Sequence, residues 1–332
     1  MDKSNYEEGM AIRMKSNKWE QELYGSNVRV ITRENNGAIY RVENEAGKAV
    51  ITRYEIYQGI ALVYNDVHTS KIRIDNKLEQ HQILEVNHCR EGQIEFETSD
   101  GEFIYIKKGD MVINTKSGVK RYSNFPQAHY HGVTIEIDLD ALQRMPLKVL
   151  EELQLDIEGM KYAFCKKERC FVLHEKEEFE HLFAELYRVP DQIRERYYKL
   201  KVMEILLFLS AIDVTNEQIE NRYFNKEIVA SVKEIHEYML LHLEEKITID
   251  LLAEKFKIAA TSLKKCFKEV YGNSIYAYLK EQRIQKATEL LKNSNIEIGR
   301  IAGMVGYDNA SKFSSSFKSV MGINPREYRK SV

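Results

Sequence analysis

The C-terminal third of the chain contains an internal repeat, and this repeat restricts the possible folds more than any other feature. Residues 252–280 align with residues 301–330 at an offset of 49, which becomes 50 after one inserted residue. At these offsets Leu252-Ala253 matches Ile301-Ala302, Phe267-Lys268 matches Phe317-Lys318, and Gly272 matches Gly322. A segment that occurs twice predicts two copies of one supersecondary motif.

Each copy predicts two short helices joined by a tight corner. Ala253 and Ala302 are small, so a second helix can cross closely at these points, and apolar residues then recur one helical turn apart. This is the layout of a helix-turn-helix, whose turn often contains glycine. Gly306 suits the second corner because glycine adopts positive φ without strain. Asp308 is expected to cap the helix that follows.

The second helix of each copy leaves a polar face outside its apolar side. The predicted outward residues are Thr261, Ser262, Lys264, Lys265 and Lys268 in the first copy, and Ser311, Lys312, Ser314, Ser315 and Lys318 in the second. Lysine binds phosphate, and short hydroxyl side chains allow close approach to base edges, so both faces suit the major groove of DNA. One such face is usually only solvated, but two in the same register favour DNA binding.

The segment between the copies and the charge distribution support this interpretation. Residues 274–293 have apolar residues mostly at helical spacing and predict a long helix. About 18 helical residues span roughly 27 Å, of the order of one duplex turn of about 34 Å.

Residues 222–332 contain 19 Lys+Arg and 13 Asp+Glu, a net charge of +6, whereas the other 221 residues carry −8. A basic third on an acidic body predicts a polyanionic partner for that third.

Residues 28–140 predict a β-rich body. Short runs rich in β-branched and aromatic residues are bounded by Gly, Asn or Asp, and Ser99-Asp100-Gly101 is typical of a hairpin turn. The predicted strands are 28–33, 38–43, 49–57, 60–67, 83–88, 93–98, 103–108, 111–114 and 133–138. Regular short strands of this kind favour a barrel or a sandwich.

From Leu142 the pattern becomes helical, with the strongest segments at 178–189 and 192–212. The apolar residues of the second segment either pack on the β-rich body or form a helix–helix dimer seam. Residues 213–226 are polar and predict a linker.

Three histidines are candidates for chemistry. His129 and His131 alternate, so on a strand they share a face, and His88 lies in another predicted strand. They are ordinary structural histidines, contacts for an anionic effector in or at the mouth of the body, or transition-metal ligands. The four cysteines follow no zinc or disulfide spacing and predict reduced thiols. We find no catalytic triad, phosphate loop or paired-carboxylate site, and therefore expect no enzyme, no cofactor and no bound metal.

Composition excludes several classes of protein. The 332 residues are 43% hydrophobic and 30% charged, which is ordinary for a globular protein of two or three domains. No apolar run approaches the length of a membrane span, and the N-terminal segment lacks a signal-peptide core. We therefore expect a cytoplasmic protein with no membrane partner.

The C-terminal third resembles the AraC/XylS family of bacterial transcription regulators. The pattern runs through Ala253, Leu263, Phe267-Lys268, Gly272, Tyr278-Leu279, Arg283-Ile284, Ala287, Leu290-Leu291, Ile301-Ala302, Gly306-Tyr307, Phe313, Phe317-Lys318, Gly322, Pro325 and Tyr328-Arg329. The resemblance implies two helix-turn-helix units on a long helix, which bind successive major grooves of promoter DNA and usually activate transcription. It adds Ala310 to the base-facing positions.

This sequence departs from the family pattern at three places. Lys257 stands where glycine is common, and Ala259 where a serine cap is common, so the first reading helix is expected to depend on packing. Ser315 stands where arginine is frequent, which implies weaker base reading by the second unit.

The stretch from Glu85 to Asn114 also resembles the cupin-type sensor barrel that is often fused to this DNA-binding domain, without the His-x-His metal motif near His88. The two resemblances imply an α+β chain. Its expected parts are a cupin-like effector-sensing barrel (1–140), a helical dimerisation segment (141–220) and the tandem helix-turn-helix domain (221–332). They imply a homodimeric, effector-modulated regulator that works with RNA polymerase. The alternatives are a metal-dependent cupin-type enzyme with a DNA-binding tether, and a regulator without an effector.

Overall fold

The chain divides into two compact units, residues 1–223 and 224–332, called here the N-terminal and C-terminal units. The computed structural model describes residues 18–25, 27–34, 36–44, 47–73, 82–98, 101–116, 119–166, 170–174, 177–214 and 224–331. Residues 99 and 100 of the predicted hairpin turn and most of the predicted linker 213–226 lie outside these residues. Among the described helices, none is both long and apolar enough to cross a membrane.

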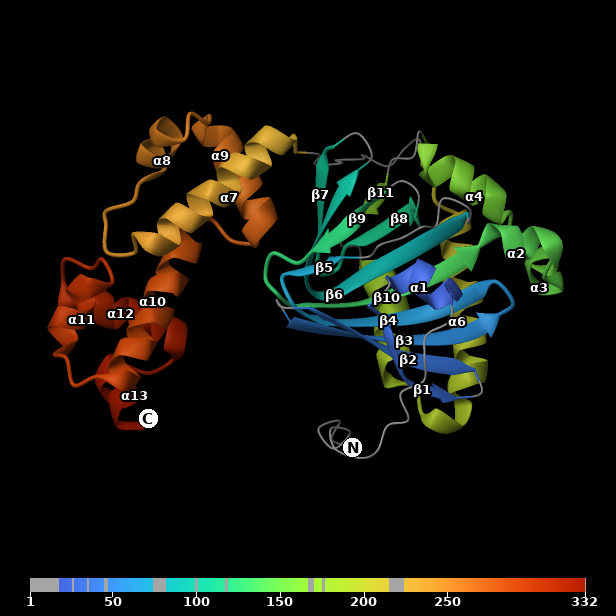
Figure 1. Cartoon of the computed structure of the whole chain (residues 1–332), viewed down its shortest axis with the longest axis horizontal. Helices are drawn as coiled ribbons and strands as arrows, with labels where there is room; N and C mark the ends of the chain where they lie inside the picture. Colours follow the sequence, from blue (N-terminus) through green and yellow to red (C-terminus); the bar gives the residue numbers. More distant parts are fainter. Residues whose placement is uncertain are drawn as a thin grey trace. The chain divides into compact units, whose positions relative to one another are not determined.

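The N-terminal unit is built on a large antiparallel sheet (Figure 1). Its strands are β1 (Arg29–Glu34), β2 (Gly37–Asn44), β3 (Gly47–Tyr57), β4 (Ile60–His68), β5 (Lys71–Arg73), β6 (Ile83–Thr98), β7 (Phe103–Lys107), β8 (Met111–Thr115), β9 (Val119–Asn124), β10 (Tyr130–Asp138) and β11 (Phe171–Leu173). The main order is β1-β2-β3-β4-β10-β6-β8-β11, while β5 pairs with β9, and β7 and β9 pair with β6.

The long strand β6 joins two layers of strands. Its first part pairs with β10 and β8, and from Gln93 onward it pairs with β7 and β9. The strands predicted at 83–88 and 93–98 are therefore one strand. Its register with β10 shifts beside His131, and Gly92 has a φ of +78°. This irregularity turns β6 from one layer into the other.

The cupin-like barrel that the resemblance implied is not confirmed. Among the described strands, β1 pairs only with β2, and β11 pairs only with β8, so the sheet is not closed. The short strands β5, β9 and β11 were not predicted, because runs of three to six residues give too little alternation to detect.

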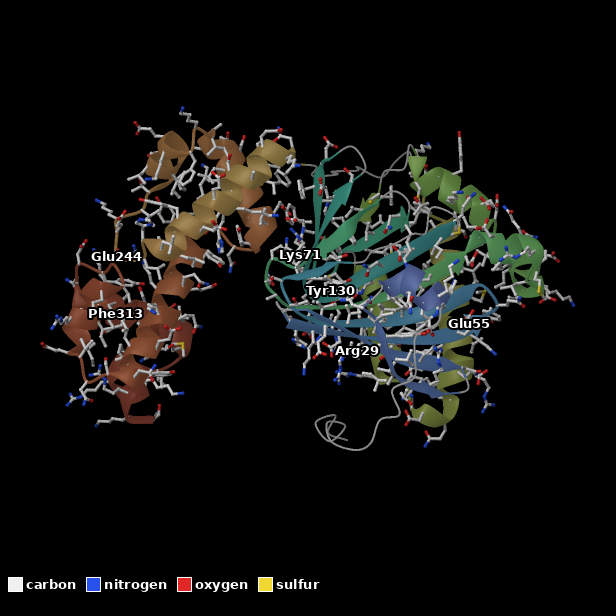
Figure 2. All side chains as sticks on the ribbon, viewed as in Figure 1. Arg29, Glu55, Lys71, Tyr130, Glu244 and Phe313 are labelled. Atoms are coloured by element: carbon white, nitrogen blue, oxygen red, sulfur yellow. The ribbon has the colours of Figure 1, made fainter. Side chains whose placement is uncertain are left out.

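Alternate residues of the sheet face two different cores. On β10, Val133, Ile135 and Ile137 belong to the core under the helices, whereas Tyr130, labelled in Figure 2, faces the core between the two layers of strands. This follows from the period of two in side-chain direction along a strand. The sheet is thus buried on both faces, which explains why its strands are so apolar.

Helices cover one face of the sheet. They are α2 (Leu139–Arg144), α3 (Lys148–Glu152), α4 (Ile157–Phe164), α5 (Glu177–Ala184), the 3-10 turns η5 (Glu185–Arg188) and η6 (Asp191–Ile193), and α6 (Arg194–Ser210), while α1 (Lys18–Tyr24) packs on the other core. The helical segments predicted at 178–189 and 192–212 are present, interrupted at Pro190. Tyr198 of α6 packs on Tyr54 and Tyr64 of the sheet, with ring centroids 5.3 and 6.0 Å apart.

In its described part, residues 224–331, the C-terminal unit has seven helices: α7 (Lys226–Leu241), α8 (Ile249–Lys255), α9 (Ala260–Tyr271), α10 (Ile275–Asn293), α11 (Ile298–Met304), α12 (Ala310–Met321) and α13 (Pro325–Ser331). The predicted repeat is α8–α9 and α11–α12, and the predicted long helix is α10. Figure 1 shows α8 and α9 toward one end of α10, and α11 and α12 toward the other. Phe313 and Phe317 form the centre of the second copy, and Figure 2 labels Phe313 among these helices.

The two corners each contain a left-handed residue, but its type differs. Lys257 in the first corner has a φ of +52°, and Gly306 in the second has +77°. Asp308 is not the cap of α12. Asn309 has this role, because its side-chain oxygen accepts hydrogen bonds from the backbone N–H groups of Ser311 and Lys312 (2.7 and 3.3 Å). The chain turns one residue later than expected, so the cap moves by one position.

Candidate nucleic-acid interface and sensor site

The predicted reading faces of α9 and α12 point away from the cores of their copies. Leu263, Phe267, Phe313 and Phe317 are fully buried, which fixes which side of each helix faces outward. Of the predicted DNA-contacting residues, Thr261, Lys264, Lys265, Lys268, Ala310, Ser311, Lys312 and Ser315 are exposed, and Ser262 and Ser314 are half-buried. Every predicted position is therefore at the surface of its helix.

Helices α9 and α12 differ in the hydrogen bonds that their own side chains make at and after the first turn. Asn309 caps α12, whereas Ala259 at the start of α9 offers no side-chain cap. The Ser314 hydroxyl donates a hydrogen bond to the Ala310 carbonyl (2.9 Å), so its proton is used within the helix. Ser311, Lys312 and Ser315 are the side chains of α12 that remain best placed for a ligand.

Arg283 connects the two copies, a role that the sequence did not reveal. It lies on α10 and donates from Nη1 to the Gly306 carbonyl (3.1 Å) and from Nη2 to the Glu245 carbonyl (2.6 Å). The first contact holds the second corner, and the second holds the loop before α8. Burial lowers the pKa of Arg283, yet its two fixed acceptors keep the guanidinium in place. The two reading helices therefore have a defined separation, set by the 19 residues of α10.

His88 does not join the other two predicted histidines. Its ring stacks on Phe183 with centroids 4.4 Å apart, and neither ring nitrogen has a hydrogen-bond partner among the described residues. Burial lowers its pKa to about 4, so the ring is neutral at physiological pH. His88 lines an open groove of about 660 Å³ beside η5 instead of the space between the strand layers.

We expect His88 to make the N-terminal unit acid-sensitive. Between its unfolded pKa near 6.5 and its folded value, the unfolded chain binds a proton that the folded chain rejects, so stability falls as the pH falls. The loss is about 3 kcal/mol from pH 7 to pH 4. Urea titrations followed by the fluorescence of Trp19, the chain's one tryptophan, measure it. His88→Leu should be less acid-sensitive by this amount, and identical slopes in the variant and the wild type would refute the assignment.

His129 and His131 lie beside His68, at a partly exposed end of the sheet face that farther along carries the helices. On β10, Tyr130, Thr134 and Glu136 line the cavity between the strand layers, so the alternating His131 faces the other way. The sequence placed this pair in or at the mouth of the body, and neither ring is among the residues that line the cavity between the strand layers. The three rings are 4.5 to 5.6 Å apart between centroids.

The cavity between the strand layers has a volume of about 130 Å³ and contains a buried charged network. Glu136 pairs with both Arg53 and Lys116 (2.8 Å to Lys116), and Lys116 also pairs with Glu85 (3.1 Å). Although burial alone would raise the pKa of Glu136, Lys116 and Arg53 hold it below its ordinary value. Burial lowers the pKa of Lys116, but Glu136 and Glu85 raise it more.

The residues of this network were not predicted from the sequence, although the sequence contains a pattern that indicates them. Glu85 alternates with Asn87, and Thr134 alternates with Glu136, within strands that are otherwise apolar. Polar residues with a period of two on a buried face indicate a polar interior.

The fold of the C-terminal unit and its two exposed reading faces define a tandem helix-turn-helix protein. The family described as "Helix-turn-helix domain" matches residues 252–331, from α8 to the end of α13. The chain is 26% identical over 142 residues to the uncharacterized HTH-type transcriptional regulator YdeC of Bacillus subtilis, covering 42% of this chain and 48% of that protein. It is 32% identical over 100 residues to the xylose operon regulatory protein of Escherichia coli K12, covering 30% and 25%.

Among solved structures, the C-terminal domain of AraT, a response regulator from Geobacillus stearothermophilus, is 32% identical, with a TM-score of 0.30, and covers 31% of this chain and 85% of that chain. Residues 252–331 therefore form a helix-turn-helix domain of the AraC/XylS type. The chain spans between a quarter and about half of the length of the curated relatives described above.

Proposed function

We propose that the protein is a sequence-specific DNA-binding transcription regulator that activates transcription. Its helices α9 and α12 enter two successive major grooves on one side of promoter DNA. The observation that carries this proposal is the pair of exposed lysine- and hydroxyl-bearing faces, whose separation is set by α10 and by Arg283. A 19-residue helix spans about 28 Å, close to the rise of one duplex turn.

The two copies have different tasks in this proposal. Lys264, Lys265 and Lys268 give α9 three exposed cations, whereas α12 has two, Lys312 and Lys318, beside its exposed hydroxyl-bearing residues. The first copy therefore supplies the larger share of the phosphate attraction. DNA binding by the second copy depends more on the capped first turn of α12 and on its short polar side chains, which allow the helix to come close to the DNA.

The double variant Lys264→Ala/Lys265→Ala should lose specific DNA affinity by about 10- to 100-fold at physiological salt, because two phosphate contacts are lost. The plot of log affinity against log salt should also become less steep, by about two units. Fluorescence anisotropy with a duplex selected from random sequence by the wild-type protein measures both quantities.

The matched control is Lys226→Ala/Lys292→Ala, which removes two exposed lysines outside α9 and α12. This control should keep the wild-type affinity for the selected duplex. If the two double variants weaken binding equally, the charge of the unit as a whole attracts DNA, and α9 has no special role.

The effector of this regulator is a small molecule that binds between the strand layers of the N-terminal unit. The support is the cavity there, which combines an apolar wall with Asn65, Asn87 and the charged side chains of Glu85, Lys116 and Glu136. A few converging polar groups in an otherwise apolar cavity are typical of ligand sites. The cavity is small, so a compact ligand with both donors and acceptors fits it best. A thermal-shift screen of the full chain, followed through Trp19, tests for such a ligand.

The regulator acts as a cytoplasmic homodimer that contacts RNA polymerase. Support for the dimer comes from α6, where Leu200, Leu207 and Phe208 are exposed on one side of the helix while its other side packs on the sheet. The spacing of seven and eight residues places them on one stripe. Sedimentation of the full chain and of Leu200→Glu tests whether this stripe is the seam.

A further inference from the structure

A cluster of three imidazoles and two carboxylates lies at a partly exposed end of the N-terminal sheet, on the face that farther along carries the helices. One ring nitrogen from each of His68, His129 and His131 lies within 4.8 Å of the others. Asp66 Oδ1 is 2.8 Å from His68 Nε2 and 2.7 Å from His131 Nε2. Glu91 Oε2 is 3.7 Å from His129 Nε2 and from His131 Nδ1.

The strand register brings these residues together. Asp66 and His68 alternate on β4, and His129 and His131 alternate at the start of β10, so each pair shares one face. Antiparallel pairing sets Asp66 opposite His131 and Val67 opposite Tyr130, which leaves His68 beside His129. On the other side of β10, Glu91 of β6 is opposite His131. Three strands therefore contribute to one patch.

The backbone at His129 is held tightly. A Cβ atom on Gly92 would lie 2.0 Å from the His129 carbonyl oxygen, so only glycine allows β6 to approach this closely. The preceding residue, Ala128, has a φ of +53°, and its N–H group donates to the Phe125 carbonyl (2.8 Å). The turn and the close strand contact thus fix the position of the His129 backbone, from which the imidazole side chain extends.

We propose that His68, His129 and His131 bind a divalent transition-metal ion, with Zn²⁺ as the ion that the site fits best. Three imidazoles at this spacing reach a common ion after small rotations about their side-chain bonds, because zinc–nitrogen bonds are about 2.0–2.1 Å long. Asp66 supplies the fourth ligand, because its oxygen already lies between two of the ring nitrogens. Glu91 orients the rings of His129 and His131 from outside the ligand set.

The donor set and its charge favour this ion. Imidazole nitrogen and carboxylate oxygen are standard ligands of zinc, whereas calcium and magnesium prefer sites made of oxygen alone. The carboxylates of Asp66 and Glu91 together balance the charge of a divalent ion. The site joins β4 to the turn that precedes β10, so the ion would cross-link these segments and stabilise the N-terminal unit. This inference does not depend on the proposed DNA-binding function.

The test uses the full chain, purified without a histidine tag and stripped with a chelator. Zinc is titrated against a chromophoric chelator, and the metal content after desalting is measured by mass spectrometry. We expect one zinc ion per chain, a higher midpoint of thermal unfolding by Trp19 fluorescence, and, with Co²⁺, visible absorption of tetrahedral strength.

Variants separate this site from other zinc ligands. The double variant His129→Ala/His131→Ala should lower zinc affinity at least about 100-fold, and Asp66→Asn about 10- to 100-fold. The matched controls are His181→Ala at an exposed ring and Cys165→Ser, both of which should keep the wild-type affinity. If the double variant unfolds, the single change His68→Gln at the end of β4 gives the same test.

Three results would overturn the proposal. The first is an affinity that is unchanged in the histidine variants. The second is an affinity that follows Cys165. The third is a wild-type chain that does not retain zinc through desalting and whose thermal midpoint is the same with and without zinc.

Discussion

Gly306→Ala is expected to destabilise the second helix-turn-helix copy by about 3 kcal/mol. A Cβ atom at this position would lie 2.4 Å from the Leu243 carbonyl oxygen and 2.6 Å from Arg283 Nη2. The first neighbour is backbone, so relief requires the loop before α8 to move. The φ of +77° adds about 1 kcal/mol of strain for any residue with a Cβ atom, and the overpacking adds about 1–3 kcal/mol. The same change pushes Arg283 from the carbonyls that join the two copies.

Gly303→Ala is the matched control for this change. Gly303 lies in α11, three residues earlier, and a Cβ atom there meets nothing within 4 Å. Alanine should stabilise that helix by about 0.5–1 kcal/mol. Hydrogen exchange with peptide resolution measures the opening of α11 and α12 in the full chain, separately from the N-terminal unit. Equal protection in the two variants would mean that the corner is not held as the structure shows.

Glu136→Gln is expected to cost the N-terminal unit about 3–5 kcal/mol. Glu136 is 5% exposed and pairs with two buried cations, Arg53 and Lys116. Glutamine keeps the shape but removes the charge, and an uncompensated buried cation is strongly unfavourable. Glu85 still faces Lys116 and Glu55 still faces Arg53 at 3.3 Å, which limits the loss.

Glu55→Gln is the control, because it removes the exposed partner of the same arginine. The Glu55 side chain is 49% exposed, so its pair with Arg53 should contribute less than about 1 kcal/mol. Urea unfolding monitored by Trp19, whose ring lies 4.7 Å from the Arg53 guanidinium, compares the two variants directly. A similar loss in both variants would contradict the central position of Glu136.

The C-terminal unit was largely predictable from the sequence because its signals are local. The repeat, the helical spacing of Phe313 and Phe317, and the glycine at position 306 each act within a few residues of the chain. Lys257 stands where glycine is common in the resembling family, and its φ of +52° shows that the first corner keeps the left-handed conformation without a glycine. The contacts of Arg283 were not predictable, because a backbone carbonyl 38 residues away leaves no pattern in the sequence.

Most strands and helices of the N-terminal unit were predictable from the sequence, but the pairing of the strands into a sheet was not. Strand order, the bend of β6 and the open edges depend on contacts between residues far apart in the chain, which periodicity does not record. The histidines show the same limit. Alternation correctly predicted that His129 and His131 share a face, but only the register with β4 shows which face it is and that His68 joins them. His88, equally plausible in the sequence, is instead stacked on Phe183.

Hydroxyl-radical footprinting of the full chain on a selected duplex tests the central claim most directly. If α9 and α12 read successive major grooves, two protected patches should appear on one side of the DNA, with centres about 10 base pairs apart. Lys264→Ala/Lys265→Ala should weaken the patch under α9, and Lys312→Ala should weaken the patch under α12. A single protected patch, or two patches that both variants weaken alike, would contradict the proposal that the two copies read DNA as separate, fixed units.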